Sequence, residues 1–362
     1  MKRILLYAGA LSLWGMSAMA EDGALEAIST PYVASSESPS GPASLGLDVM
    51  TYAPGSDPVR FKFSTHMAFG PGNQEIVTDL KNNRFVFRDS PEDPFQISPV
   101  SLSGPHSVVY NPADRLYYAN DTENHRIIAF ADLSSETLTA QTKNIAGIPL
   151  KRPHDIVLDS ATGWIYAINP NSGHVVRFTA IGENESAISV PVQGYARALT
   201  FANGKLYAIG SAKGRIVEIV DWDTPTFTIY DSFDPTGRRG PAGSWTKTGL
   251  VLNDAEFFEG FWYATSFFTK QYAGGTDCDE NKFIRFKTLD DLVTGNWTDL
   301  SSLVPSGMTP YYLTVNGDKL YLAIFNSELP GSGDAILQFT PSKALSSPVK
   351  KDQSNKALEA TR

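Results

Sequence analysis

Three of the five histidines in this 362-residue chain stand at matching places in a repeated pattern. His106 and His154 lie directly before strand–turn–strand patterns, in GPHSVVYNPADRLYYAND and RPHDIVLDSATGWIYAIN, and His66 takes the same place in THMAFGPGNQEIVTD. Neutral imidazoles that converge on one point suit Zn²⁺ or a similar cation, with one coordination position left open for water or substrate. We therefore predict that these three histidines bind one divalent metal ion, with zinc as the best match.

The same position continues along the chain with three residues of complementary chemistry, Arg197, Asp254 and Tyr311. An arginine can hold a carboxylate through two parallel hydrogen bonds. A tyrosine can transfer a proton when a nearby cation lowers its pKa. An ionised aspartate can orient a histidine or act as a base. The alternative is a ring of polar residues that fills a channel and holds ordered water without any chemistry.

Six residues so far apart in the sequence can meet only if a repeated fold brings them together. Six segments align, each with a short apolar strand, a turn, a strand rich in Tyr and Ile, another turn and a third strand, and they span 65–87, 105–130, 153–178, 196–219, 253–286 and 310–339. A fourth strand follows most of them, at 95–101, 186–192, 227–233 and 297–303. Four antiparallel strands repeated at this period are typical of propeller blades.

We therefore predict an all-β fold, a single six-bladed β-propeller over residues 45–341. The sixth unit lacks a fourth strand, and the N-terminal segment LGLDVMTYA (45–53) can supply it and close the ring. In a propeller the innermost strands line a central channel, so equivalent positions of the six units form a ring around it. The six candidate residues would then face one another at one mouth of the channel.

The two ends of the chain have the composition of segments outside the fold. Residues 1–20 have a basic start, an apolar run and Ala18-Met19-Ala20, which is the pattern of a secretory signal peptide cleaved after Ala20. We predict export to the periplasm or the exterior. Residues 21–44 are interpreted as a lead-in linker and 342–362 as a disordered tail. No other stretch is long and apolar enough to span a bilayer.

The overall charge and the single cysteine exclude some functions. The chain has 39 acidic and 30 basic residues and a net charge of −9, without a basic stripe, so nucleic acid is not expected as a partner. Cys278 cannot form an internal disulfide, and the aspartates beside it disfavour a reactive thiolate. The long loop 233–249 carries Arg238, Arg239 and Trp245, which can bind an anionic or sugar-like ligand or a protein partner; a solvated loop is the alternative.

Two turn sequences carry a resemblance to a known class of propellers. VTDLKNNRFVF (77–87) and ANDTENHRIIAF (119–130) match the aspartate–asparagine–arginine–aliphatic turn of NHL repeats. The chain resembles the six-bladed propellers of that class over most of its mature length. The resemblance implies the fold and says little about activity, because propellers host many functions.

The peptidyl-hydroxyglycine amidating lyases are similar to this chain in the contexts of two histidines. That family holds zinc with histidines in PHS and PHD contexts and uses an arginine and a tyrosine in catalysis, and GPHS at His106 and RPHD at His154 match those contexts. The family's metal histidines are not on three consecutive blades, however, and its common disulfides have no counterpart here. Its exact reaction therefore does not carry over. Propeller-type polysaccharide lyases are similar in the kinds of residue at their sites. They use a histidine or tyrosine as the base, and an arginine or metal neutralises a uronate carboxylate.

Two functions from different classes remain. In the first, the protein is an exported, metal-dependent lyase or hydrolase that acts at the central channel on a carboxylated small molecule, a peptide end or a uronate sugar. Arg197 then holds the substrate anion, Tyr311 transfers a proton, and Asp254 orients or accepts one. In the second, the protein is a non-catalytic NHL-type binding or scaffold propeller, and its channel residues are filler.

Overall fold

The computed structural model describes residues 46–54, 59–235, 249–267 and 281–342, all of which belong to one compact unit, Pro42–Arg362. Several sequence predictions fall outside the described residues: the signal peptide, the lead-in linker, Arg238, Arg239, Trp245, Cys278 and the C-terminal tail. Within the described ranges, no helix has the length and apolarity needed to cross a membrane.

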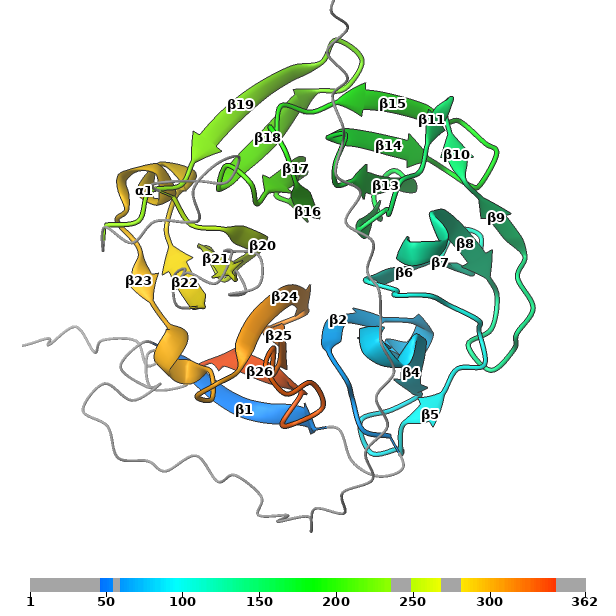
Figure 1. Ribbon diagram of the computed structural model, residues 1–362, viewed down its shortest axis with the longest axis horizontal. Helices are drawn as coiled ribbons and strands as arrows, with labels where there is room; N and C mark the ends of the chain where they lie inside the picture. Colours follow the sequence, from blue (N-terminus) through cyan, green and yellow to red (C-terminus); the bar gives the residue numbers. More distant parts are fainter. Residues whose placement is uncertain (1–45, 55–58, 236–248, 268–280, 343–362) are drawn as a thin grey trace, which may run out of the picture. The chain divides into compact units, whose positions relative to one another are not determined.

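Six four-stranded antiparallel sheets stand around a common centre, so the predicted six-bladed β-propeller is confirmed (Figure 1). From the inner to the outer strand, blade 1 consists of β2 (Ser64–Phe69), β3 (Glu75–Asp79), β4 (Arg84–Arg88) and β5 (Gln96–Ile97). Blade 2 consists of β6 (Val108–Asn111), β7 (Leu116–Asp121), β8 (Arg126–Phe130) and β9 (Ala140–Thr142). Blade 3 consists of β12 (Asp155–Asp159), β13 (Trp164–Asn169), β14 (His174–Phe178) and β15 (Ser186–Ser189). Blade 4 consists of β16 (Ala196–Ala202), β17 (Lys205–Gly210), β18 (Arg215–Asp221) and β19 (Thr226–Asp231). Blade 5 consists of β20 (Leu252–Phe258), β21 (Phe261–Ser266), β22 (Lys282–Phe286) and β23 (Thr298–Asp299).

Blade 6 joins the two ends of the described chain. Its inner strands are β24 (Thr309–Asn316), β25 (Lys319–Phe325) and β26 (Ala335–Pro341), and its outer strand is the N-terminal β1 (Leu47–Pro54). β1 runs antiparallel to β26, from the pair Leu47–Pro341 to the pair Pro54–Ala335. The predicted closure of the ring by an N-terminal strand is therefore confirmed.

Small elements add to the blades. The hairpin of β10 (Asn144–Ile145) and β11 (Ile148–Pro149) follows blade 2, and the helix α1 (Leu289–Thr294) precedes β23. Short 3-10 turns lie at Pro71–Asn73, Leu80–Asn82, Thr122–Asn124 and Ser301–Leu303. The structure also gives blade 2 an outer strand, β9, for which the sequence shows no clear pattern. β9 is three residues long and half exposed, too short and too polar to show an apolar alternation.

Two fully buried aspartates explain the turn sequence of blades 1 and 2. Asp79 accepts hydrogen bonds from the Lys62 backbone N–H and from Arg84 Nε, at 2.6 and 2.8 Å. Asp121 accepts from the Ser103 backbone N–H and from Arg126 Nε, both at 2.7 Å. Each carboxylate thus ties the turn before the third strand to the chain that enters the blade, which is a structural role.

Side-chain-to-backbone hydrogen bonds link the six inner strands to one another. At each junction a side chain of one inner strand bonds the backbone of the next. In blade order the bonds are Thr65 Oγ1 to His106 O, Ile156 N to Ser107 Oγ, Leu199 N to Asp155 Oδ2, Thr200 Oγ1 to Ala255 O, Leu313 N to Asp254 Oδ2, and Thr314 Oγ1 to Met67 O. These bonds fix the inner strands at defined heights, so side chains of different blades meet reproducibly at the centre.

Candidate functional site

The register between the first and second strands defines which residues occupy the ring position. The residues opposite the middle of the second strand are Met67, Val108, Ile156, Leu199, Ala255 and Leu313. The residue two places before each of them forms the set Thr65, His106, His154, Arg197, Asn253 and Tyr311. We call this set the channel ring. Four of the six residues predicted from the sequence belong to it, whereas His66 and Asp254 each lie one residue further along.

A β-bulge explains the shift. The pairing of the inner strand is irregular in blades 1, 4, 5 and 6, and the residues skipped there are Thr65, Arg197, Asn253 and the pair Tyr311–Tyr312. In blades 2 and 3 the inner strand begins only after His106 and His154. A bulge places an extra residue in one strand and re-aims its side chain. The channel ring is therefore the position where the inner strand leaves regular pairing.

Contacts between opposite blades place these side chains at the centre. Tyr312 Oη, from blade 6, lies 2.7 Å from His154 Nδ1 in blade 3 and donates to the Arg197 carbonyl in blade 4, also at 2.7 Å. Arg197 Nη1 lies 3.3 Å from Tyr311 Oη, which again joins blade 4 to blade 6. The rings of His106 and His154 are neighbours, with centroids 3.9 Å apart. Blades 2, 3, 4 and 6 thus contribute to one cluster.

The hydrogen bonds of His154 assign its tautomer. Its Nδ1 lies 2.9 Å from the carbonyl oxygen of Arg197, which can only accept. Nδ1 must therefore carry the proton, since an unprotonated nitrogen would face that oxygen lone pair to lone pair. The Tyr312 hydroxyl gives its own proton to the same carbonyl and can accept from Nδ1. Nε2 of His154 consequently keeps its lone pair.

His106 has the same tautomer for the same reason. Its Nδ1 lies 3.1 Å from the Gly104 carbonyl and 3.1 Å from Thr122 Oγ1. The Thr122 hydroxyl donates its proton to the Pro153 carbonyl at 2.7 Å, so it can only accept from His106. Neither Nε2 has a hydrogen-bond partner among the residues that the structure describes. Two adjacent blades thus place two neutral imidazole rings next to each other, 3.9 Å apart between centroids.

Burial keeps these imidazoles neutral. It lowers the pKa of His106 to about 3 and that of His66 to about 4. Burial also holds the pKa of His154 well below its ordinary value, with the adjacent His106 as the next cause. A neutral imidazole can accept a hydrogen bond or a proton from a substrate, or bind a cation. Both rings are therefore unprotonated at neutral pH, although their low pKa values make them weak bases.

We expect nitrogen-15 NMR to show both rings as neutral Nδ1–H tautomers between pH 5 and 8. The reason is that the pKa of His106 lies at about 3 and that of His154 is also well below the ordinary value. Spectra of the His106→Gln and His154→Gln variants would assign the signals. Titration of either ring with a midpoint above about pH 6, near the free value, would contradict the assignment.

His66 does not complete a preformed three-histidine site. Its ring packs edge-on against Tyr312, with centroids 5.9 Å apart, and Tyr312 in turn contacts His154 at 6.2 Å. Its buried Nδ1 has no hydrogen-bond partner among the described residues. In the same part of the chain, no group of three or more His, Cys, Asp or Glu is placed to hold a metal ion. The geometry brings together His106 and His154 and leaves His66 beside them as a separate group.

Asp254 joins two blades. Its Oδ1 accepts from the Ala255 backbone N–H at 2.8 Å, and its Oδ2 accepts from the Leu313 backbone N–H of blade 6 at 2.7 Å. Asp155 makes the equivalent pair of bonds between blades 3 and 4. The described contacts of Asp254 include no hydrogen bond to a histidine. Its position therefore corresponds to that of Asp155 and differs from that of His154.

Arg197 and Tyr311 provide the polar partners of the histidine pair. Both are buried, with 8% and 3% of their surfaces exposed. The Arg197 guanidinium lies over the Tyr195 ring, 5.2 Å from its centroid, and its Nη1 contacts the Tyr311 hydroxyl. A buried guanidinium attracts a carboxylate and stabilises a phenolate. This side of the channel ring suits an anionic substrate group.

Sequence reasoning missed Asn253 and Tyr312. Both lie next to predicted residues, Asp254 and Tyr311, and both occupy the irregular part of an inner strand. Alignment of the units on the second strand, where alanine follows tyrosine in YYAND, IYAIN, LYAIG and WYATS, would have found Asn253. Alignment on the first strand cannot reveal the extra residue of a bulge.

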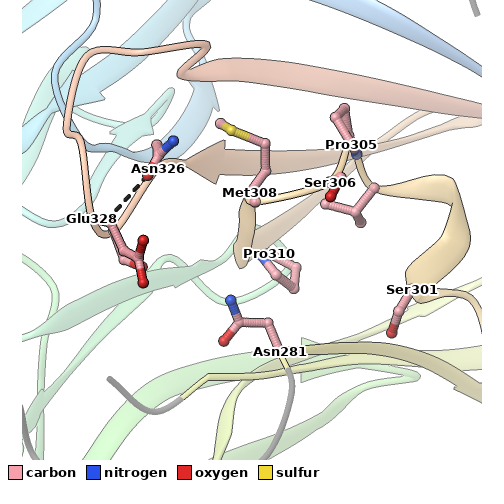
Figure 2. Close-up of a pocket in the computed structure, with 11 residues that line it drawn as sticks. Asn281, Ser301, Pro305, Ser306, Met308, Pro310, Asn326 and Glu328 are labelled. Carbon is pink, nitrogen blue, oxygen red and sulfur yellow. Dashed lines mark hydrogen bonds between the residues drawn. The ribbon is translucent and has the colours of Figure 1, made fainter. Parts of the chain in front are cut away.

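A cavity of about 430 Å³ opens at the start of β24 (Figure 2). Its walls include Asn281, Ser306, Met308, Pro310 and Glu328. None of the six channel-ring residues lines it. We therefore base the candidate site on the buried polar cluster, and we regard the cavity as a neighbouring feature.

No family model and no curated protein matches the sequence. Solved structures match in fold. The chain is similar to a virginiamycin B lyase from Staphylococcus aureus in a structure with quinupristin (10% identity, TM-score 0.52, covering 81% of this chain and 99% of that one). It is also similar to a putative gluconolactonase (14%, 0.54, 82% and 92%) and to a luciferin-regenerating enzyme (12%, 0.54, 82% and 95%). At such identities these matches show the propeller fold alone.

Proposed function

We propose that the protein is an exported propeller enzyme, a lyase or hydrolase that acts on a small carboxylated substrate at the channel ring. One observation carries the proposal: the rings of His106 and His154, each held by a carbonyl at Nδ1, are neighbours in a buried cluster that also contains Arg197. Unprotonated imidazoles next to a fixed cation can accept a proton from a carbon beside a carboxylate, or from water. Structural neighbours that include a lyase and a putative lactonase are compatible with such an activity.

Each residue has a role that follows from its contacts. Arg197 binds the substrate carboxylate, and its charge lowers the cost of a negative charge on Tyr311, whose hydroxyl lies 3.3 Å from Nη1. One Nε2 of the histidine pair takes a proton from the substrate carbon or from water, and Tyr311 gives a proton to the leaving oxygen. The Gly104 carbonyl holds the His106 imidazole, and the Arg197 carbonyl holds the His154 imidazole, in the Nδ1–H tautomer that leaves Nε2 unprotonated.

The divalent ion predicted from the sequence remains a proposal, with zinc as the best match. His106 and His154 would hold it, because each donates Nδ1–H to a backbone carbonyl and keeps Nε2 free, an arrangement common among metal-ligating histidines. His66 would have to move to become a third ligand, since it is not grouped with them. A bound ion would polarise a substrate oxygen. An ion bound to both Nε2 atoms would leave neither free to take a proton, so the metal site and the histidine base proposed above are alternatives.

A binding or scaffold role is the second candidate, and one observation favours it. The Tyr312 hydroxyl and His154 satisfy each other and the Arg197 carbonyl across the channel without any ligand. Such a closed network is what a polar filler of the channel would look like. In that case substitutions in the channel ring would change stability and leave partner binding intact.

Assays of the mature protein, from residue 21, test the enzyme proposal. The His154→Ala and Arg197→Met variants are expected to lose at least about 100-fold in kcat/KM for uronate elimination or lactone hydrolysis. His125→Ala is the matched control, because this exposed turn histidine only accepts a bond from the Arg152 backbone. Elemental analysis of the same samples tests the metal: about one ion per wild-type chain and little in His154→Ala would support it. No activity in the wild type or in any variant would favour the scaffold role, and equal activity in all variants would exclude the channel ring as the active site.

A further inference from the structure

Asn253 is a fully buried amide whose hydrogen-bonding groups are unused. It is 0% exposed, and neither Oδ1 nor Nδ2 has a hydrogen-bond partner among the described residues. Buried polar groups are nearly always paired, because loss of water without a replacement is costly. Asn120 shows the ordinary case at the same burial. Its Oδ1 accepts from the backbone of His106 and Ser107, and its Nδ2 donates to Ser107 Oγ.

The position of Asn253 connects this amide to the candidate site. It belongs to the channel ring, as the blade 5 counterpart of His154 and Arg197, and it is the residue skipped at the bulge of β20. Along the ring it stands between Arg197 of blade 4 and Tyr311 of blade 6, which contact each other at 3.3 Å. An unpaired amide costs free energy when it is buried, and a bulge places this one in the channel ring. Such a group is characteristic of a residue that binds a ligand.

We propose that Asn253 is a substrate-binding residue that recognises a neutral group able both to donate and to accept a hydrogen bond, located beside the substrate carboxylate. This inference rests on the proposed function, in which Arg197 takes the carboxylate. An amide side chain offers one acceptor and two donors, so its natural partner is a group of mixed character. A hydroxyl of a sugar acid and an amide of a peptide end both have that character, whereas an alkyl group has not.

The first test is stability without ligand. Asn253→Leu keeps the branched shape of the side chain and removes the unpaired groups, so the melting temperature is expected to rise by about 2 °C or more. Asn120→Leu is the matched control and should lower the melting temperature, because it leaves the backbone N–H groups of His106 and Ser107 without partners and removes one of the two bonds at Ser107 Oγ. A fall for Asn253→Leu that matches the fall for Asn120→Leu would show an ordinary structural role and would overturn the inference.

The second test is binding, measured by calorimetry with D-galacturonate, N-acetylglycine and butyrate as probes. Wild type should bind one of the first two at least about 10-fold more tightly than butyrate, which lacks the neutral polar group. Asn253→Leu and Asn253→Ala should abolish that preference and leave butyrate binding unchanged. Preference for galacturonate would indicate a sugar acid, and preference for N-acetylglycine a peptide end.

Arg197→Met separates the two proposals. If it weakens all three probes while the Asn253 variants bind them as wild type does, the role of Asn253 is wrong and the proposed function stands. If wild type binds none of the probes, or if Arg197→Met changes nothing, both proposals fail. A selective loss in the Asn253 variants, together with a general loss in Arg197→Met, would support both.

Discussion

In a protein that begins at residue 21, deletion of residues 21–54 is expected to abolish cooperative folding. These residues carry β1, which forms the outer strand of blade 6 and pairs with β26 along its whole length. Without β1, the backbone groups of β26 become an open edge, and the core around Leu337 and Phe339 loses its cover from Leu47. Open apolar edges pair with other chains, so the truncated protein should aggregate.

Circular dichroism melting and size-exclusion chromatography would measure this effect. The matched control is deletion of residues 21–45, which leaves β1 intact and should give a monodisperse protein that melts like the protein beginning at residue 21. If the protein without residues 21–54 stays monomeric and melts within about 2 °C of that reference, a shift equivalent to roughly 1 kcal/mol or less, the ring does not depend on β1. Similar losses in both deletions would assign the effect to the segment before the strand.

The fold was predictable because the physical signal is repeated six times. Each unit needs an apolar strand, a glycine- or asparagine-containing turn and a second strand to bury one face, so the pattern recurs even where the residues differ. The closing strand could be inferred from the missing fourth strand of the last unit. The outer strand of blade 2 could not, because the three residues Ala140–Thr142 make few contacts that demand an apolar side chain.

The candidate site was predictable only to within one residue. His106, His154, Arg197 and Tyr311 share the ring position, but the sequence pattern points to His66 and Asp254 where the ring residues are Thr65 and Asn253. A bulge inserts one residue into a strand, and beyond it every side chain changes face. The first strand alone carries no mark of this insertion. The pairing with the second strand reveals it, together with the contact of Tyr312 across the channel.

The centre of the propeller also contains buried carboxyl groups. Burial raises the pKa of Asp155 to about 7. Burial, and then the charge of Asp155, raise the pKa of Asp254 well above its ordinary value. The pKa of Glu256 is raised in the same way, first by burial and then by Asp254. Glu256 is only half-buried by surface area, so its exposure to solvent weakens the effect there.

These groups and the buried histidines affect stability in opposite directions. The folded chain keeps a proton on Asp155 up to about pH 7 while the unfolded chain loses it near pH 4, so stability falls as pH rises through this window, by about 1.4 kcal/mol per unit for one group. The unfolded chain protonates His106 below about pH 6.5 while the folded chain does so only near pH 3, so stability falls as pH decreases there. Between pH 4 and 6.5 the two effects largely cancel, and above pH 6.5 the carboxyl effect remains.

The melting temperature of the wild type is therefore expected to fall as the pH rises above 6.5, and Glu256→Gln should reduce that fall. Glutamine has the shape of a protonated glutamate and cannot ionise, so the variant should melt at least about 3 °C higher than the wild type at pH 9 and close to it at pH 5. Glu259→Gln, at the exposed turn after the same strand, is the matched control and should leave the profile unchanged. The same difference between Glu256→Gln and the wild type at both pH values would show that shape or packing causes the effect. A difference that grows with pH would show that ionisation of Glu256 opposes folding, as expected for a carboxylate enclosed with Asp155 and Asp254.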